Sequence, residues 1–369
     1  MDDIRQAVAG QALRTMKGHQ EETMDLEQFA RALPKAELHL HLEGSVAPRI
    51  LQKLAYRNAV SLPAVAAIED LFQFDNLTDF LDVYDLVARS MVDADDFHLV
   101  TYEALARVAK SGGRYVEFFF SPQAHRGVHI GTMLPGILRA MDDVETDLGL
   151  VSRLIPAINR ELGVDRAFEF LDLVLPFRSD KVIGIGLDYD ELPYPPTPFK
   201  PVYDRARKAG MRLTIHSGWD GPPGYVRDSL ELLGVERIDH GYRTVEDPDL
   251  LAFCREANVP FTICPTSVTT LTGWRDLRSQ THPIRIMLDA GLNLVVNSDD
   301  PGLLKTDLAT EYLVLAETMS VDRSTLAKLA MNSLEAAWLD ESVKREWREI
   351  WLAEIDGLLT QTEEAPVGN

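Results

Sequence analysis

The sequence predicts an α/β protein, and within that class a (β/α)8 barrel of the TIM type. Eight short β-rich runs occur in order along the chain, and longer segments with helical periodicity separate them. Several runs are apolar throughout, which is typical of strands that a parallel sheet buries on both faces. A chain of 369 residues is long enough for one such barrel.

Composition limits the classes of partner. The net charge of −21 argues against nucleic acid or an anionic membrane as the main partner, because both attract clustered Lys and Arg. Only Cys254 and Cys264 are present, so no disulfide framework is expected and the reducing cytoplasm is the expected location. No apolar run is long enough to cross a bilayer. We therefore expect a soluble protein with a small-molecule substrate, and the sequence carries no signal for an oligomeric state.

The expected elements begin with an N-terminal arm or helix over residues 1–25, followed by the barrel domain over 26–359. The eight strands are expected at 36–42, 114–120, 151–158, 181–187, 212–216, 237–240, 260–264 and 292–298. Apolar spacing of three and four residues predicts helices at 79–87, 95–109, 133–144 and 307–319. The first two strands are far apart, so we expect a helical insertion over 47–94 near the barrel mouth. Residues 360–369 are expected to form a flexible tail.

Histidines and carboxylates follow several of the expected strands, where barrel enzymes place their chemistry. His39 and His41 alternate with leucines on the first run, so both imidazoles should face the same side. His216 ends the fifth run, His240 ends the sixth, and Asp299-Asp300 follow the eighth. Imidazole nitrogen is a common ligand of Zn²⁺ and similar ions, and a carboxylate is a suitable further ligand. The pattern indicates a metal site.

The same residues also have plain structural interpretations. His39 and His41 could lie on the wet face of an edge strand, and His216 and His240 could be hydrogen-bonded core histidines. Residues 299–301 could form a turn or a helix cap. The shared position at strand ends favours a common site over these alternatives. The other histidines fall in helical or loop stretches and are expected to be solvated or locally bonded; they are His19, His98, His125, His129 and His282.

Several motifs occur in order between Pro34 and Trp338. They are Pro34-Lys35-Ala36-Glu37-Leu38-His39-Leu40-His41-Leu42-Glu43-Gly44-Ser45, His240-Gly241-Tyr242, Cys264-Pro265-Thr266-Ser267 and Asn297-Ser298-Asp299-Asp300-Pro301, followed by Thr306 and Glu311-Tyr312. Together these motifs resemble the adenosine and AMP deaminase family of the amidohydrolase superfamily. The resemblance implies a barrel with one Zn²⁺ per chain, held by His39, His41, His216 and Asp299.

The resemblance also implies roles around the metal. His240 and Asp299 would hold the reactive water, whose pKa a zinc ion brings towards roughly 7. By the resemblance, Asp300 would bond a ring nitrogen of the substrate. Adjacent side chains on an extended segment point apart, so Asp299 and Asp300 are expected to do different jobs, one at the metal and one at the substrate. Glu43 matches the family position that meets the ribose 5′ hydroxyl.

Two departures from the family pattern concern the substrate. The family's His-Ala-Gly-Glu, whose glutamate shuttles a proton to the purine ring, reads His216-Ser217-Gly218-Trp219-Asp220 here, so Trp219 stands at the glutamate position. An indole N–H donates a hydrogen bond but cannot shuttle a proton. A family glycine after the fourth strand is Tyr189. We expect Trp219 and Tyr189 to reshape the substrate pocket, and Asp220 or Glu43 to supply the missing acid.

Three functions therefore remain open. The first is a zinc-dependent aminohydrolase that deaminates a purine-like, pterin or other aromatic amine, with plain adenosine disfavoured by Trp219. The second is a metal hydrolase of the same fold that acts on a different bond. The third is an inactive binding or regulatory homologue, against which the intact ligand set and His240 argue.

Overall fold

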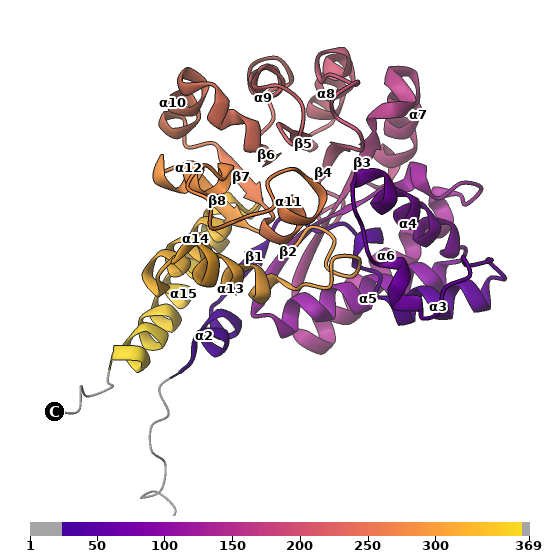
Figure 1. Cartoon of the computed structure of the whole chain (residues 1–369). Coiled ribbons are helices and arrows are strands. Elements are labelled where there is room, and N and C mark those ends of the chain that lie inside the picture. The colour runs from indigo at the N-terminus through magenta and orange to yellow at the C-terminus, as the bar shows by residue number, and fades with distance from the viewer. Residues whose placement is uncertain (1–23, 364–369) are drawn as a thin grey trace, which may run out of the picture.

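The chain folds as a (β/α)8 barrel, as the alternating pattern predicts. The structure is a computed structural model that describes residues 24–363, and its eight parallel strands follow one another in chain order around the barrel (Figure 1). Most of the expected N-terminal arm over 1–25 lies outside the described residues. The strands are β1 (Lys35–Glu37), β2 (Gly113–Phe120), β3 (Val151–Asn159), β4 (Gly184–Asp188), β5 (Arg212–Ser217), β6 (Arg237–His240), β7 (Pro260–Ile263) and β8 (Asn293–Val296).

The barrel closes between the ends of β1 and β8. The strand expected over 36–42 is shorter than predicted, because β1 ends at Glu37 and isolated bridges pair Leu40 with Asp299 and His41 with Phe119. The His41 N–H donates to the Asp299 carbonyl at 2.8 Å, and the Asp299 N–H donates to the His39 carbonyl at 3.1 Å. The backbone of three predicted metal ligands thus makes the closing bonds of the barrel.

Extra helices occupy the connection between β1 and β2, as expected. They are α3 (Pro48–Arg57), the 3-10 turn η2 (Ile68–Leu71) and α4 (Leu77–Ser90), and they precede α5 (Ala94–Lys110). Asn76 caps α4 by accepting a hydrogen bond from the Asp79 N–H, and the helix buries one apolar face that includes Phe80 and Tyr84. In Figure 1, α3 and α4 lie on the same side of the barrel as α5 and α6.

Most of the remaining helices surround the barrel, and α11 (Pro265–Leu271) lies over its centre (Figure 1). Before β1 lies α2 (Leu26–Ala32), and the later ones are α6 (Ile130–Leu148), α7 (Gly163–Val174), α8 (Lys200–Lys208), α9 (Pro223–Asp228), α10 (Pro248–Glu256), α11 (Pro265–Leu271), α12 (Pro283–Asp289), α13 (Leu308–Met319), α14 (Arg323–Ala336) and α15 (Glu341–Glu363). The tail expected from residue 360 is wrong at its start, since α15 continues to Glu363. Within residues 24–363, no helix is both long and apolar enough to span a bilayer.

A buried ion pair crosses the barrel interior below the expected site. Arg237, at the start of β6, donates from Nη1 to Glu117 Oε2 on β2 at 2.6 Å, and both side chains are fully buried. Glu117 also accepts from the Trp338 N–H and the Tyr115 hydroxyl, while the Arg237 guanidinium stacks 4.3 Å from the Trp338 ring centre. These contacts tie β2, β6 and the segment after α14 together.

Candidate metal centre and active site

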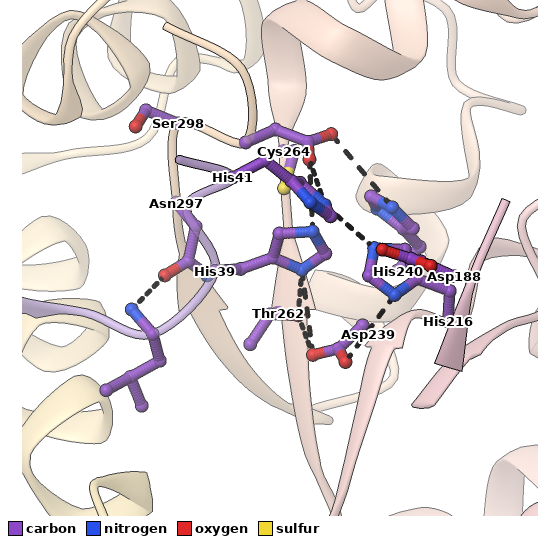
Figure 2. A network of polar contacts seen from close by, with 12 residues as sticks. His39, His41, Asp188, His216, Asp239, His240, Thr262, Cys264, Asn297 and Ser298 are labelled. Carbon is purple, nitrogen blue, oxygen red and sulfur yellow. Dashed lines mark hydrogen bonds and ion pairs between the residues drawn. The ribbon is translucent and has the colours of Figure 1, made fainter. Parts of the chain in front are cut away.

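Three imidazoles and one carboxylate converge at the carboxyl ends of β1, β5 and β8. His39 Nε2 lies 3.0 Å and His41 Nε2 lies 3.4 Å from Asp299 Oδ1, and the Nε2 atoms of His41 and His216 are 3.1 Å apart. Figure 2 shows the rings of His39, His41 and His216 gathered at one point. One ligand atom from each of the four residues lies within 4.8 Å of the others. This set fits a single divalent metal ion.

The protonation states of three of the four donors suit a metal. Burial lowers the pKa of His41 to about 4 and lowers that of His216 well below its usual value, so both rings are neutral near pH 7. Neutral imidazole is the form that coordinates metal. The pKa of Asp299 is also well below its usual range, because burial is outweighed by His39, His240 and His41, so it presents a carboxylate. His41, His216 and Asp299 are therefore in their ligand forms. The pKa of His39 is raised to about 9, because the effect of burial is outweighed by Asp299 and Asp239, so this ring releases a proton when it binds a metal.

Behind the ligands lies Asp239, a residue that the sequence interpretation missed. His39 Nδ1 lies 2.8 Å from Thr262 Oγ1 and 3.6 Å from Asp239 Oδ1, and Thr262 donates to that same oxygen at 2.9 Å (Figure 2). Thr214 donates to the other Asp239 oxygen at 2.6 Å. Such outer carboxylates orient ligand imidazoles and raise their basicity. The sequence signal that could have revealed Asp239 is a single carboxylate in a buried strand, directly before His240.

Backbone strain marks three ends of the barrel strands. Tyr189, His240 and Asp299 have φ angles of 69°, 70° and 61°, in the left-handed region that few non-glycine residues adopt. Tyr189 directly follows β4, His240 is the last residue of β6, and Asp299 lies three residues after β8. Strained residues persist where the surrounding structure over-determines them, and they cluster at active sites. At His240 the side chain is 4% exposed and lies against the ligand rings.

Gly44 makes room for Asp300. A Cβ placed on Gly44 would lie 1.7 Å from Asp300 Oδ1, so any larger residue would displace that carboxyl group. Burial raises the pKa of Asp300 well above its usual value, and the charges of Asp299 and Glu43 raise it further. Asp300 therefore holds a proton more readily than an exposed aspartate, and its protonated form can donate a hydrogen bond. Gly44 in the first motif thus leaves the space that the Asp300 side chain occupies after the eighth strand.

A cavity opens beside the metal centre. Its apolar lining comes mainly from α4 and α11. The lining consists of His41, Leu77, Phe80, Leu81, Tyr84, Asp188, Tyr189, Glu191, His216, Trp219, His240, Ser267, Leu271, Asp299 and Asp300. The predicted residues Tyr189, Trp219, His240 and Asp300 are all in this lining. Glu43 and Asp220 are not among the lining residues. The site can hold a small aromatic molecule next to a metal ion.

Residues 34–351 match the sequence family described as adenosine deaminase, over most of the chain. The chain belongs to the adenosine deaminase family. Its relatives include proteins named adenine deaminase from Sphingopyxis alaskensis, 41% identical over 86% of this chain and 93% of its own length, and from Acinetobacter baylyi, 37% identical over 88% and 98%.

Solved structures of the family share the fold. An adenine deaminase from Arthrobacter aurescens is 36% identical, with a TM-score of 0.84, and covers 89% of this chain and 100% of its own. An amidohydrolase from Burkholderia ambifaria with bound Zn is 33% identical, with a TM-score of 0.87, and covers 92% and 95%. With the ligand set described above, these relatives make the chain a metal-dependent aminohydrolase.

Glu43, which the sequence resemblance matched to a position that meets a ribose hydroxyl, is enclosed by protein. Its Oε1 accepts from the Ser121 N–H at 3.0 Å and lies 2.8 Å from His125 Nε2, and its Oε2 accepts from the Tyr84 hydroxyl at 3.0 Å. Glu43 is fully buried, so it is placed behind the cavity wall and not in it. The expectation of a solvated or surface role for His125 is wrong, because its ring is buried between Glu43 and the Ala88 carbonyl. Only the fold reveals this pairing.

The loop that carries Trp219 is held in place by Glu191. The Glu191 carboxylate accepts from four consecutive N–H groups, at 2.6 to 3.2 Å, those of Gly218, Trp219, Asp220 and Gly221. The Trp219 ring lies 4.4 Å from the His240 ring and forms part of the cavity lining. The chain therefore presents an indole at the position where the sequence resemblance implies a glutamate. Asp220 follows in the loop, and the structure does not bring it into the lining.

Proposed function

We propose that this protein hydrolytically deaminates a free 6-aminopurine base such as adenine, using one zinc ion per chain, in the cytoplasm. The enclosed state of Glu43 is the observation that carries the choice of a base over a nucleoside. The names of the relatives from Sphingopyxis alaskensis and Arthrobacter aurescens support the same substrate class. The zinc in the Burkholderia ambifaria protein supports the metal, and two free buried cysteines suit a reducing compartment.

The residues around Glu43 leave neither of its carboxylate oxygens free to bind a ribose hydroxyl. Both Glu43 oxygens already accept hydrogen bonds from protein groups, so a sugar hydroxyl would have to displace one of them. The Tyr84 and Tyr189 rings meet edge to face, with centroids 6.2 Å apart, and both line the cavity. Tyr189 stands where the resemblance implies a glycine, and its ring lines the cavity there. A flat base fits between these aromatic walls and the metal ligands.

The residues of the site have separable roles in the reaction. A bound zinc ion supplies a water of lowered pKa at neutral pH. His240 lies in the lining with its pKa lowered by burial to about 3, so it is neutral and can accept a proton from water. Asp299 lies 4.0 Å from His240 Nε2 and is placed to orient the same water. In its protonated form, Asp300 donates a hydrogen bond to a ring nitrogen of the base.

The test is ammonia release from adenine and from adenosine by zinc-loaded protein. Adenine should be turned over and adenosine should not. A His240→Ala variant should stay folded, keep its zinc and lose roughly 10²–10⁴-fold in kcat, the usual contribution of a general base. Preferential turnover of adenosine would reject the assignment of a free base. An inert wild type with full zinc would favour the binding homologue, and turnover of a purine with a different leaving group alone would favour the second hydrolase function.

A further inference from the structure

We propose that Asp188 delivers the proton to the ring nitrogen of the substrate. The indole of Trp219 cannot carry out this step, because it has no acidic group. The inference rests on the proposed deamination and assigns its missing acid. Asp188 is the last residue of β4 and lines the cavity beside Tyr189. Figure 2 draws it with the residues around the ligand rings.

The contacts of Asp188 leave one oxygen available. Ser121 Oγ donates to Asp188 Oδ2 at 2.9 Å, which fixes the orientation of the carboxyl group. Asp188 Oδ1 is buried and has no hydrogen-bond partner in the described part of the chain. The residue as a whole is 4% exposed. A buried oxygen without a partner in a cavity wall is costly unless a ligand or a proton occupies it, so it marks a place for substrate contact.

The surroundings of Asp188 keep it protonated near neutral pH. Burial raises its pKa to about 7, the negative charge of Glu43 adds to this, and the Ser121 hydrogen bond and the Arg160 charge oppose it. Titratable groups from the surrounding elements act on Asp188 or feel its charge; they are Glu43, Tyr84, Arg160, Tyr189, Tyr203 and Asp300. A pKa close to the working pH is what general acid catalysis requires.

The other candidate acids are less well placed. Asp220 is absent from the cavity lining, and both oxygens of Glu43 accept protein hydrogen bonds. Asp300 has its Oδ1 against Gly44, and the proposed function already assigns it a hydrogen bond to another ring nitrogen. Asp188 ends the strand next to β5, which leads into the Trp219 loop. It is therefore the neighbouring strand-end acid on the side where the family places its proton shuttle.

The proton balance of the step is complete with Asp188 and His240. Water oxygen bonds to the amine-bearing carbon while His240 accepts one water proton; the carbon–nitrogen π pair moves to the ring nitrogen, which takes the proton of Asp188. His240 then returns its proton to the amine, the exocyclic C–N bond breaks with its electron pair on nitrogen, and ammonia leaves. The hydroxyl proton on the carbon passes to Asp188, so both residues regain their starting states and the product is the ring lactam.

The experiment compares zinc-loaded Asp188→Asn with wild type on adenine. Asparagine can still accept the Ser121 hydrogen bond, so zinc content and thermal unfolding should match wild type. We expect kcat to fall by roughly 10²–10⁴-fold with KM changed by less than about threefold, because the lost interaction belongs to the transition state. In wild type, kcat should fall as the pH rises through about 7, where Asp188 loses its proton, and the variant should lack this alkaline limb.

The matched control is Asp190→Asn, which removes an acid from the same loop that does not line the cavity. It should leave kcat and the alkaline limb unchanged. An Asp188→Asn protein that keeps the limb, or that retains kcat within about threefold of wild type, would overturn the assignment. Loss of the alkaline limb in an Asp220→Asn protein, with kcat otherwise unchanged, would also overturn the assignment.

An infrared arm separates this inference from the proposed function. Difference spectra of zinc-loaded protein between about pH 5 and about pH 9 should contain a carboxylic acid band that Asp188→Asn removes. If neither adenine nor a related aminopurine releases ammonia, the proposed function fails, and the band still decides whether Asp188 is a protonated cavity acid. A spectrum that Asp188→Asn leaves unchanged would reject the inference even if adenine is deaminated.

Discussion

At the scale of single residues, the metal centre depends on side chains that never reach the cavity. Asp239 is fully buried, and it contacts His39 at 3.6 Å and His216 at 3.9 Å. Burial would raise the pKa of Asp239, yet its pKa lies below the usual value because His39, Arg237 and Thr214 favour the charged form. A carboxylate at this place orients two ligand rings at once.

Replacement of Asp239 by Asn should therefore weaken zinc binding by about 10–100-fold without removing a ligand. The zinc dissociation constant, measured by competition with a chelator, tests this prediction. Asp172→Asn removes an exposed acid paired with Arg205 and should leave that constant unchanged. Equal affinities of Asp239→Asn and wild type would show that the outer carboxylate has no effect on the metal.

At the scale of elements, the loop after β4 separates two cavities. Tyr189 lines the cavity at the metal centre and also a second cavity, which is lined by residues from the segments 122–133 and 159–173. Its φ of 69° is one that glycine adopts at no cost. The same residue thus narrows the substrate site and closes it from the neighbouring space.

A Tyr189→Gly variant should open this wall and admit a nucleoside. The ratio of kcat/KM for adenosine to that for adenine should rise by roughly 10-fold or more, the scale on which pocket shape discriminates substrates. Tyr194→Gly is the matched control, since Tyr194 is on the same loop but is 37% exposed and lines neither cavity. An unchanged ratio in Tyr189→Gly would mean that Tyr189 does not exclude the sugar.

At the scale of the whole molecule, the barrel interior combines an ion pair with the closing bonds at the metal centre. Arg237 and Glu117 join β6 to β2 across the barrel, and Asp239 lies two residues after Arg237, directly behind the ligands. Rigid support of this kind fixes the ligands within a narrow range of positions. Stability and metal geometry are therefore coupled through β6.

Removal of Arg237 alone should show how much the ion pair with Glu117 contributes to stability. Arg237→Met leaves a buried carboxylate without its cation and should lower the free energy of unfolding by about 3–5 kcal/mol. The double variant Arg237→Met, Glu117→Gln should recover part of that loss, because no uncompensated charge stays buried. Urea unfolding at one fixed zinc concentration is the measurement, since bound metal itself stabilises the fold. A single variant as stable as wild type would contradict the prediction.

The sequence by itself determined the barrel and the set of residues that meets at its candidate metal centre. Local alternation predicts strands, apolar runs predict burial on both faces, and parallel strands bring their carboxyl ends to one edge, so His39, His41, His216 and Asp299 could be placed together without coordinates. The boundaries were less well predicted, because β1 gives way to isolated bridges where the barrel closes.

Only the tertiary structure decided which neighbours surround that set. Glu43 meets His125 from 82 positions away, and Asp188 meets Ser121 from 67. No local pattern encodes such pairs, since burial, pKa and hydrogen bonding depend on residues that are distant in the chain. For this reason the sequence pointed to Asp220 and Glu43 as replacement acids, whereas the folded chain encloses Glu43, leaves Asp220 outside the lining and presents Asp188 to the cavity.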